Sequence, residues 1–168
     1  MRQGLWDAIG PVRERGFPVK WVRPEGVHLT LKFLGDVDDA REPELRAALT
    51  EAAGHGEPRG VTIQIEGFGV FPDVKRPRVV WAGVTPDPAL ELLQHRVEQV
   101  FAPLGFPTEA RPFRPHVTLG RGDCRGVESS LAAIAFTATT IITDLDLMQS
   151  TPQSGGAVYQ VKHRGRLS

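Results

Sequence analysis

Apolar residues recur with helical spacing along four stretches of the chain: 5–12, 39–54, 88–101 and 129–136. Steps of three and four residues bring them to one face of a helix, so each stretch is predicted to be an amphipathic helix. Asp39 is placed to cap the second helix. Asp87 and Pro88 supply a cap and a proline at the first helical position of the third.

Alternation of apolar and polar residues predicts strands between these helices. The predicted strands cover residues 19–22, 27–34, 61–66, 78–84, 115–121, 139–148 and 157–163. Flexible connections are expected at 54–58 and 151–156. Pairs of strands interleaved with helices favour a mixed α/β or α+β fold with largely antiparallel sheets.

Length and charge limit the number of domains and the ways in which the protein can hold a substrate. The chain has 168 residues, enough for one domain or for two small lobes that share one core. It carries 20 basic and 20 acidic side chains, so an anionic substrate must be held by a local cluster rather than by an overall field. No apolar run has the length of a membrane span or the character of a signal peptide, so we expect a cytoplasmic protein.

A short motif occurs twice, 88 positions apart, at 28–31 (His-Leu-Thr-Leu) and at 116–119 (His-Val-Thr-Leu). Each copy follows a proline-containing segment and lies on a predicted strand. Side chains alternate between the two faces of a strand, so the histidine and threonine of each copy share one face and the apolar residues, including Phe33, belong to the core. If the two strands lie side by side, a polar site forms from His28, Thr30, His116 and Thr118.

Such a site suits phosphodiester chemistry. One neutral imidazole can take a proton from an attacking hydroxyl or water, and one protonated imidazole can give a proton to the leaving oxygen. Threonine hydroxyls can donate to the non-bridging phosphate oxygens, and a guanidinium can offset the developing charge. Arg121 is the natural candidate, but its odd separation from His116 places it on the opposite face unless the strand ends or twists at Gly120.

Other interpretations of these residues carry less weight. Paired histidines can hold zinc, but neither copy has a cysteine or carboxylate at ligand spacing, so we expect acid–base chemistry without a metal. Cys124 is the single cysteine and is interpreted as a reduced thiol without a role. The remaining histidines, His55, His95 and His163, lie in a loop, on a helix and near the chain end, and we interpret them as surface residues.

Basic residues surround the second motif and form one further cluster. Phe113 and Arg114 precede it, and they could contact a base and an RNA backbone, although Phe113 is equally suited to the core. The rest of the basic residues lie at Arg111, Arg121 and Arg125 near the motif, and at Lys75, Arg76 and Arg78 in a predicted loop. Both clusters are either solvated rims or contacts for a polynucleotide.

The blocks that hold the motifs resemble a known family. Residues 27–35 read Val-His-Leu-Thr-Leu-Lys-Phe-Leu-Gly, and residues 113–121 read Phe-Arg-Pro-His-Val-Thr-Leu-Gly-Arg. They resemble the paired motifs of the 2H phosphoesterase superfamily, and most closely its branch of RNA 2′,3′-cyclic phosphodiesterases, historically called 2′-5′ RNA ligases. The resemblance extends through 78–83 and 147–159.

This resemblance implies one domain over 1–168 with a bilobal, pseudo-symmetric α+β fold, in which two antiparallel sheets flanked by helices surround a central cleft. It also implies hydrolysis of a terminal 2′,3′-cyclic phosphate, on RNA or on a nucleotide, to a 2′-phosphate without a cofactor. The implied roles are His28 as proton donor, His116 as proton acceptor, and Thr30, Thr118 and Arg121 as phosphate-binding residues. We expect a monomer that makes no membrane contact.

Three questions stay open at the level of sequence. The nearly symmetric motifs do not show which histidine is the acid. The chain could instead join 2′,5′ linkages, which is the same transesterification in reverse, or bind RNA ends without turnover. Family members usually begin with an apolar strand, whereas this chain starts almost directly at its first helix. We therefore expect either that this start is truncated or misassigned, or that the lobe that carries His28 has an incomplete sheet.

Overall fold

The computed structural model describes residues 1–54 and 59–168. The helices are α1 (Arg2–Ala8), α2 (Gly10–Arg13), α3 (Glu42–Gly54), α4 (Pro88–Phe101) and α5 (Val127–Leu131), with 3₁₀ turns η1 (Pro24–Gly26), η2 (Asp39–Arg41) and η3 (Ala102–Leu104). The strands are β1 (Val19–Trp21), β2 (Val61–Phe71), β3 (Val79–Val84), β4 (His116–Gly122), β5 (Thr137–Ile142), β6 (Asp144–Thr151) and β7 (Val158–Arg166). His55 and most of the predicted connection at 54–58 lie outside the described residues.

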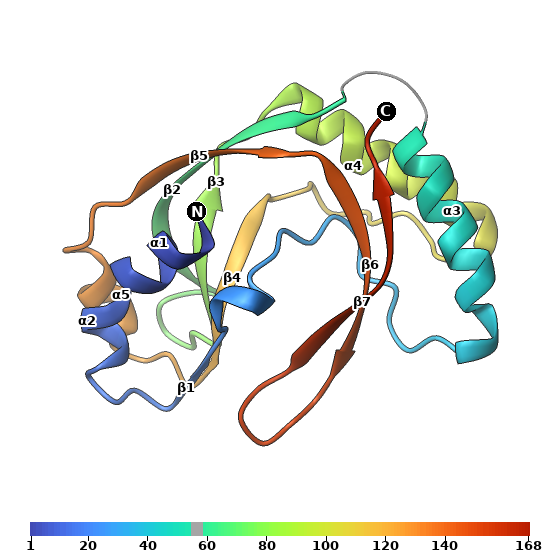
Figure 1. The fold of residues 1–168 in the computed structure, drawn as a ribbon. Helices are drawn as coiled ribbons and strands as arrows, with labels where there is room; N and C mark the ends of the chain where they lie inside the picture. Colours follow the sequence, from blue (N-terminus) through green and yellow to red (C-terminus); the bar gives the residue numbers. More distant parts are fainter. Residues whose placement is uncertain (55–58) are drawn as a thin grey trace.

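The strands form two antiparallel sheets (Figure 1). The larger sheet has the order β1-β4-β3-β2-β5, and the smaller one pairs β6 with β7. Helix α3 packs against β6 and β7, and α4 packs against α3 and β2. The prediction of an α+β fold with antiparallel sheets is therefore confirmed.

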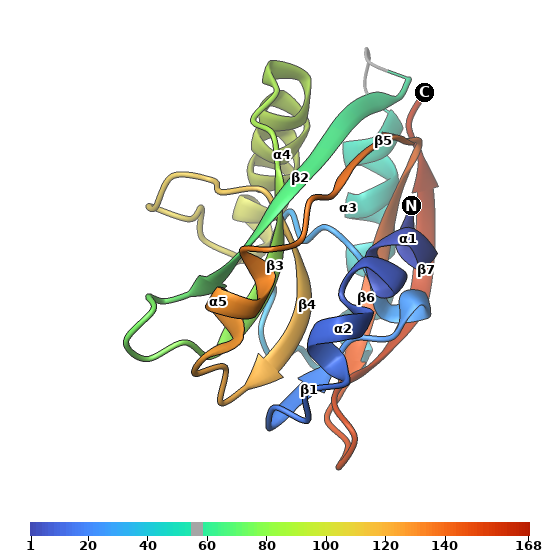
Figure 2. The ribbon, with the colours of Figure 1, turned by 90° about the vertical axis from the view of Figure 1, so that its left-hand side faces the viewer.

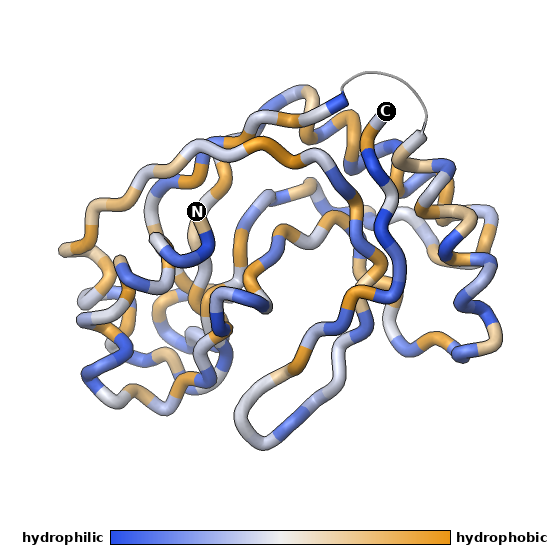
Figure 3. The backbone as a smooth tube through the Cα atoms, viewed as in Figure 1, coloured by the Kyte–Doolittle hydropathy of each residue, from blue (hydrophilic) through white to orange (hydrophobic). Residues whose placement is uncertain are grey.

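The predicted apolar stripes of the long helices are buried. Leu45 and Leu49 of α3 and Leu90 and Leu93 of α4 are each at most 6% exposed. They join one hydrophobic cluster with the core face of the larger sheet. The tube in Figure 3 shows the same division, with apolar segments on β3 and β4 and polar segments along the outer helices. No helix in the described part of the chain is long and apolar enough to cross a membrane.

Residues 139–148 do not form the single strand that their alternation predicts. The chain leaves the larger sheet after Ile142 and enters the smaller one at Asp144, so that one alternating run supplies both β5 and β6. Figure 1 shows this run curving over the top of the molecule from one sheet to the other. Apolar and polar residues keep alternating where the chain passes from β5 to β6, because each sheet buries one of its faces. The sequence pattern therefore does not mark the end of one strand and the start of the next.

The prediction of a strand over 27–34 is wrong. Only Leu29 makes a strand-like pairing, an isolated antiparallel bridge to Val117 of β4. The same edge of β4 is already occupied further along by β1, which limits the length available for a second ladder. Phe33, expected in the core, is 83% exposed, so the alternation of this segment does not extend past its first residues.

Two helix boundaries also differ from expectation. The Asp38 carboxylate, rather than that of Asp39, caps the start of the second helical segment by accepting the backbone N–H of Ala40 at 2.8 Å, because a 3₁₀ turn precedes α3. The short helix predicted at 129–136 ends at Leu131. The predicted cap at Asp87 is confirmed, since its carboxylate accepts two backbone N–H groups at the start of α4.

Candidate active site

The bridge between Leu29 and Val117 brings the two motifs together. In an antiparallel pairing of these two residues, their neighbours also oppose one another, so His28 faces Thr118 and Thr30 faces His116. Directly opposed side chains share a face of the sheet. The four polar side chains therefore lie on one face, and their apolar neighbours lie on the other.

The burial of the two motifs agrees with this division. Val117 is 1% exposed and Leu29 packs against the core cluster, whereas both histidines are half-buried. His28 and His116 are diagonal neighbours in this pairing, and in a regular antiparallel ladder the Cα atoms of such neighbours are about 7–8 Å apart. A backbone spacing of that order suits two side chains that approach one phosphate group from both sides.

Each imidazole is held in the same way by its own backbone. The Nδ1 atom of His28 lies 2.7 Å from the carbonyl oxygen of Gly26, and that of His116 lies 2.8 Å from the carbonyl oxygen of Arg114. A carbonyl oxygen only accepts, so Nδ1 is the protonated nitrogen and donates in both cases. The Nε2 atom of each ring is then the one available to exchange a proton with a substrate.

Each histidine also has one aromatic neighbour. The ring of Tyr159 on β7 meets His28 edge-on, with 4.6 Å between ring centroids. The ring of Phe71 at the end of β2 meets His116 edge-on at 5.1 Å and stacks on Trp81 of β3. These contacts fix the planes of both imidazoles from opposite sheets. Neither Tyr159 nor Phe71 was predicted for the site, because nothing in the sequence near them marks a contact with a distant histidine.

Arg121 returns to the face of the histidines through a β-bulge. Between Gly120 and Thr118 the pairing of β4 with β3 shifts by one, which leaves Leu119 as an extra residue. Such a bulge reverses the alternation of the strand, so Arg121 regains the face of Thr118 and His116. Leu119 and Gly120 are accordingly both buried in succession. The sequence required a disturbance of the strand at Gly120, and the structure has one at Leu119, the residue before it.

The other two predicted contacts, Phe113 and Arg114, precede β4 in the chain. Phe113 is half-buried, and its ring packs against the hydrophobic core. The side chain of Arg114 is exposed, and its backbone carbonyl orients His116.

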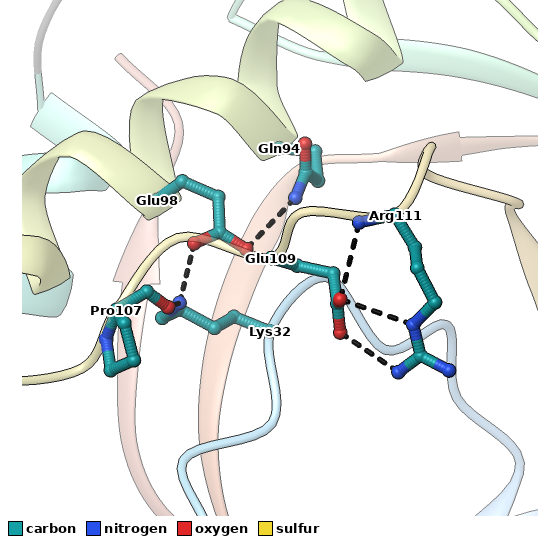
Figure 4. Close-up of polar contacts among 6 residues, drawn as sticks. All are labelled: Lys32, Gln94, Glu98, Pro107, Glu109 and Arg111. Carbon is teal, nitrogen blue, oxygen red and sulfur yellow. Dashed lines mark hydrogen bonds and ion pairs between the residues drawn. The ribbon is translucent and has the colours of Figure 1, made fainter.

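A buried ion pair anchors the segment that carries His28. Lys32 donates to Glu98 of α4 and to the carbonyl oxygen of Pro107, the latter at 2.9 Å (Figure 4). Both charged side chains are 6% exposed, and Gln94 donates to the second oxygen of Glu98 at 3.1 Å. The pair thus ties the segment to α4 where it has no sheet ladder. The sequence offered one signal for it, an acidic residue among the apolar residues of α4.

Next to this pair, the loop 107–114 carries a surface ion pair between Glu109 and Arg111. The hydrogen bonds from the Arg111 side chain lower the pKa of Glu109 to about 2. The carboxyl group is therefore ionised over the whole range in which a histidine titrates.

Cys124, His95 and His163 lie outside the candidate site. Burial raises the pKa of the Cys124 thiol, which keeps it protonated and unreactive. His95 is exposed on α4, and His163 lies on β7 with its Nε2 2.9 Å from the hydroxyl of Thr50, rather than in a terminal loop. Within residues 1–54 and 59–168, no three His, Cys, Asp or Glu side chains gather in a geometry that could hold a metal ion.

Comparisons with known proteins agree with the geometry. A family model described as the 2′-5′ RNA ligase superfamily matches residues 2–152. An RNA 2′,3′-cyclic phosphodiesterase of Aquifex aeolicus is 43% identical over 104 residues, which make up 61% of this chain and 54% of that protein. One of Archaeoglobus fulgidus is 31% identical over 146 residues, 84% of this chain and 80% of that protein.

The matched regions cover less than two thirds of several of these relatives. The shares are 54% for the Aquifex aeolicus protein, 44% for that of Geobacillus stearothermophilus and 65% for that of Methanothermobacter thermautotrophicus.

Solved structures match the fold over almost the whole chain. The protein TT0787 of Thermus thermophilus has a TM-score of 0.82 and 25% identity, and the match covers 99% of this chain and 91% of that one. E. coli LigT complexed with 3′-AMP has a TM-score of 0.74 and 27% identity, with coverage of 96% and 90%. Since the family model spans most of the sequence and the fold agrees throughout, the chain belongs to the 2′-5′ RNA ligase superfamily of 2H phosphoesterases.

Proposed function

We propose that this protein hydrolyses a terminal 2′,3′-cyclic phosphate, on RNA or on a nucleotide, to a 2′-phosphate. The observation that carries the proposal is the identical support of His28 and His116, each with Nδ1 bound to a carbonyl two residues earlier and Nε2 available. The naming of the similar proteins as RNA 2′,3′-cyclic phosphodiesterases supports the same reaction.

In the proposed reaction, Nε2 of His116 takes a proton from a water molecule as its oxygen bonds to phosphorus. The bond between phosphorus and the 3′-oxygen breaks, and protonated Nε2 of His28 gives its proton to that oxygen. The products are a 2′-phosphate and a 3′-hydroxyl, with one proton given up by His28 and one received by His116. The assignment of donor and acceptor follows the family resemblance.

The phosphate is held by groups on the same face. The hydroxyls of Thr30 and Thr118 donate to its non-bridging oxygens, and each lies opposite a histidine in the pairing that the Leu29–Val117 bridge sets. The guanidinium of Arg121 adds a positive charge that offsets the charge developing on phosphorus-bound oxygens. Charged donors of this kind contribute most where water is excluded.

The substrate class is RNA ends or nucleotides, as the LigT complex with 3′-AMP and the names of the relatives suggest. A monomeric state, a cytoplasmic location and a single domain over 1–168 remain part of the proposal. The second candidate function is formation of a 2′,5′ linkage, favoured by the family description. There a 5′-hydroxyl takes the place of water, and the two histidines keep their roles.

The test is incubation with 2′,3′-cyclic AMP in EDTA, followed by chromatographic separation of 2′-AMP from 3′-AMP. We expect 2′-AMP from the unaltered protein. His28→Ala and His116→Ala should each lower kcat by about 10²–10⁴-fold, the usual contribution of a general acid or base. His95→Ala, which changes an exposed histidine on α4, should retain full activity.

Three results would contradict the proposal. Formation of 3′-AMP would show that the other ester bond breaks. Loss of all turnover in EDTA would point to a metal-dependent reaction. Near-normal rates in both histidine variants would remove these residues from the chemistry.

A further inference from the structure

A groove with positively charged walls lies at the end of β4, away from the paired histidines. Its volume is about 430 Å³, and its lining residues are Lys75, Arg76, Pro77, Arg78, Asp123 and Arg125. The first four belong to the loop between β2 and β3, and the last two follow β4. Figure 2 shows this loop at the lower end of the larger sheet, where the arrow of β4 ends.

The groove has an excess of positive charge. Asp123 is paired with Arg125 within the lining, and the Arg125 side chain lowers the pKa of that carboxyl, so the two charges offset one another. Among the described residues, no carboxylate forms an ion pair with Lys75, Arg76 or Arg78. In a chain with no net charge, these cations give the groove a local excess of positive charge, which favours anions.

The backbone of the groove is fixed before any ligand binds. The N–H groups of Gly122 and Cys124 donate to the carbonyl oxygens of Arg78 and Pro77, at 3.0 and 3.2 Å. The carboxylate of Asp73 accepts the backbone N–H groups of Lys75 and Arg76, at 2.8 and 3.0 Å. The loop is therefore held against the end of β4, and the backbone positions that carry its basic side chains are fixed.

The groove lies at one end of β4, and His116 begins the strand at the other end. The N–H of Arg78 donates to the carbonyl oxygen of Phe71 at 2.7 Å, and the ring of Phe71 contacts His116. Between the two lies Arg121, and Lys20 of β1 is its direct partner across the sheet. These two positive side chains lie near the groove end of β4. The seven residues of β4 span roughly 20 Å, more than a single nucleotide.

We propose that this groove binds the sugar–phosphate backbone of a single-stranded RNA whose cyclic-phosphate end lies between His28 and His116. The inference rests on the proposed function and specifies its substrate as an RNA chain rather than a mononucleotide. The lining holds cations and no aromatic side chain, so it contacts phosphates rather than bases. Binding there is consequently independent of base sequence and sensitive to salt.

The first experiment measures binding without turnover. The probe is a fluorescein-labelled 12-nucleotide RNA with a 3′-phosphate, titrated by anisotropy at several salt concentrations. In the triple variant Lys75→Gln/Arg76→Gln/Arg78→Gln, the slope of log K against log salt should become shallower by about 2, since each phosphate contact on a single strand contributes about 0.7. Replacing both arginines by lysine keeps the charges and should keep the slope.

A matched control removes the same charge from the other side of the molecule. Arg46→Gln/Lys162→Gln/Arg164→Gln changes three cations of α3 and β7, each of them paired with a carboxylate. This control should bind the RNA with an unaltered slope. An equal loss in both triple variants would show a general effect of charge and overturn the proposal, as would an unchanged slope in the groove variant.

The second experiment compares two substrates. In the groove variant, KM should rise for a 12-nucleotide RNA ending in a 2′,3′-cyclic phosphate, and kcat/KM for 2′,3′-cyclic AMP should stay unchanged. An equal fall for both substrates would place these residues in the active site and overturn the groove as a separate contact. If the unaltered protein turned over neither substrate, the proposed function would fail, while the binding experiment would still decide on the groove.

Discussion

Gly69 makes room for the aromatic ring that supports the site beside His116. A Cβ atom at position 69 would lie 2.2 Å from the indole of Trp81, far inside van der Waals contact. Trp81 in turn stacks on Phe71, which contacts His116. The identity of one glycine therefore affects an imidazole two aromatic rings away.

Gly69→Ala should lower the free energy of unfolding by about 1–3 kcal/mol, the usual cost of overpacking. Urea denaturation followed by tryptophan fluorescence measures this change. Gly155→Ala is the matched control, because its Cβ would meet nothing within 4 Å and its φ is not in the left-handed region. A Gly69 variant as stable as this control would show that the indole moves aside at little cost.

The Glu109 carboxyl should titrate near pH 2 in the folded protein, because Arg111 donates hydrogen bonds to its ionised form. A pKa lowered in the folded state means that the pair stabilises the fold above the ordinary carboxyl pKa, and that this contribution disappears as the pH falls toward 2. The carboxyl carbon shift in NMR, followed against pH, measures the pKa. In Arg111→Gln it should return toward the ordinary value, and an unchanged value would show that the arginine is not its cause.

At the scale of residues, sequence alone could identify the two histidines and two threonines and place them on one face, since a doubled motif with alternating neighbours carries that information. The sequence shows that Arg121 reaches the face of the histidines only if the strand is disturbed before it. It does not show that this disturbance occurs, because a β-bulge depends on the pairing with β3. Tyr159 and Phe71 could not be found, because their contacts join residues far apart in the chain.

At the scale of elements, the segment 28–34 depends on α4 for its position. Only Leu29 pairs with a strand, and the Lys32–Glu98 ion pair fixes the following residues. A buried ion pair is costly to break from one side, because the remaining charge has no partner. The position of His28 therefore depends on a helix that lies far along the chain, since Lys32 and Glu98 are 66 residues apart.

Glu98→Gln should destabilise the protein by about 3–5 kcal/mol by leaving the Lys32 ammonium buried without a counter-charge. The double variant Lys32→Met/Glu98→Met should regain much of that loss, since neither charge is then buried. Urea denaturation of Lys32→Met, Glu98→Met and the double variant gives the coupling energy. Additive losses would mean that the two side chains do not interact in the folded protein.

The elements themselves could be predicted where one periodic run forms one element, as in α3 and α4. The two strands that were wrongly predicted fail for opposite reasons. Residues 27–34 have the right alternation but lack a free sheet edge to pair with. Residues 139–148 have an alternation that continues across two sheets, and period alone does not show where a chain changes partners.

At the scale of the whole molecule, the two sheets share one hydrophobic cluster. It contains Leu145 of β6 and Leu167 near the C-terminus together with Val80 and Val117 of the larger sheet. Helix α3 packs on the smaller sheet and α4 joins α3 to β2, so no surface separates the two halves into independent cores.

The protein should therefore unfold in one cooperative transition. Far-ultraviolet circular dichroism reports both sheets, whereas fluorescence reports Trp6, Trp21 and Trp81, none of which lies in β6 or β7. The urea midpoints from the two probes should coincide. Distinct midpoints would show that the β6–β7 sheet with α3 unfolds separately from the larger sheet.

The equal support of the two imidazoles has a consequence for the end of each cycle of the proposed reaction. After one hydrolysis, the ring that began neutral carries the proton and the ring that began protonated has lost it. Because Nδ1 of both rings is bound to a carbonyl, only Nε2 can restore the starting state, through exchange with solvent. Until that exchange occurs, the two imidazoles are protonated for the reverse of the proposed reaction, so each new forward cycle depends on proton exchange with the surrounding buffer.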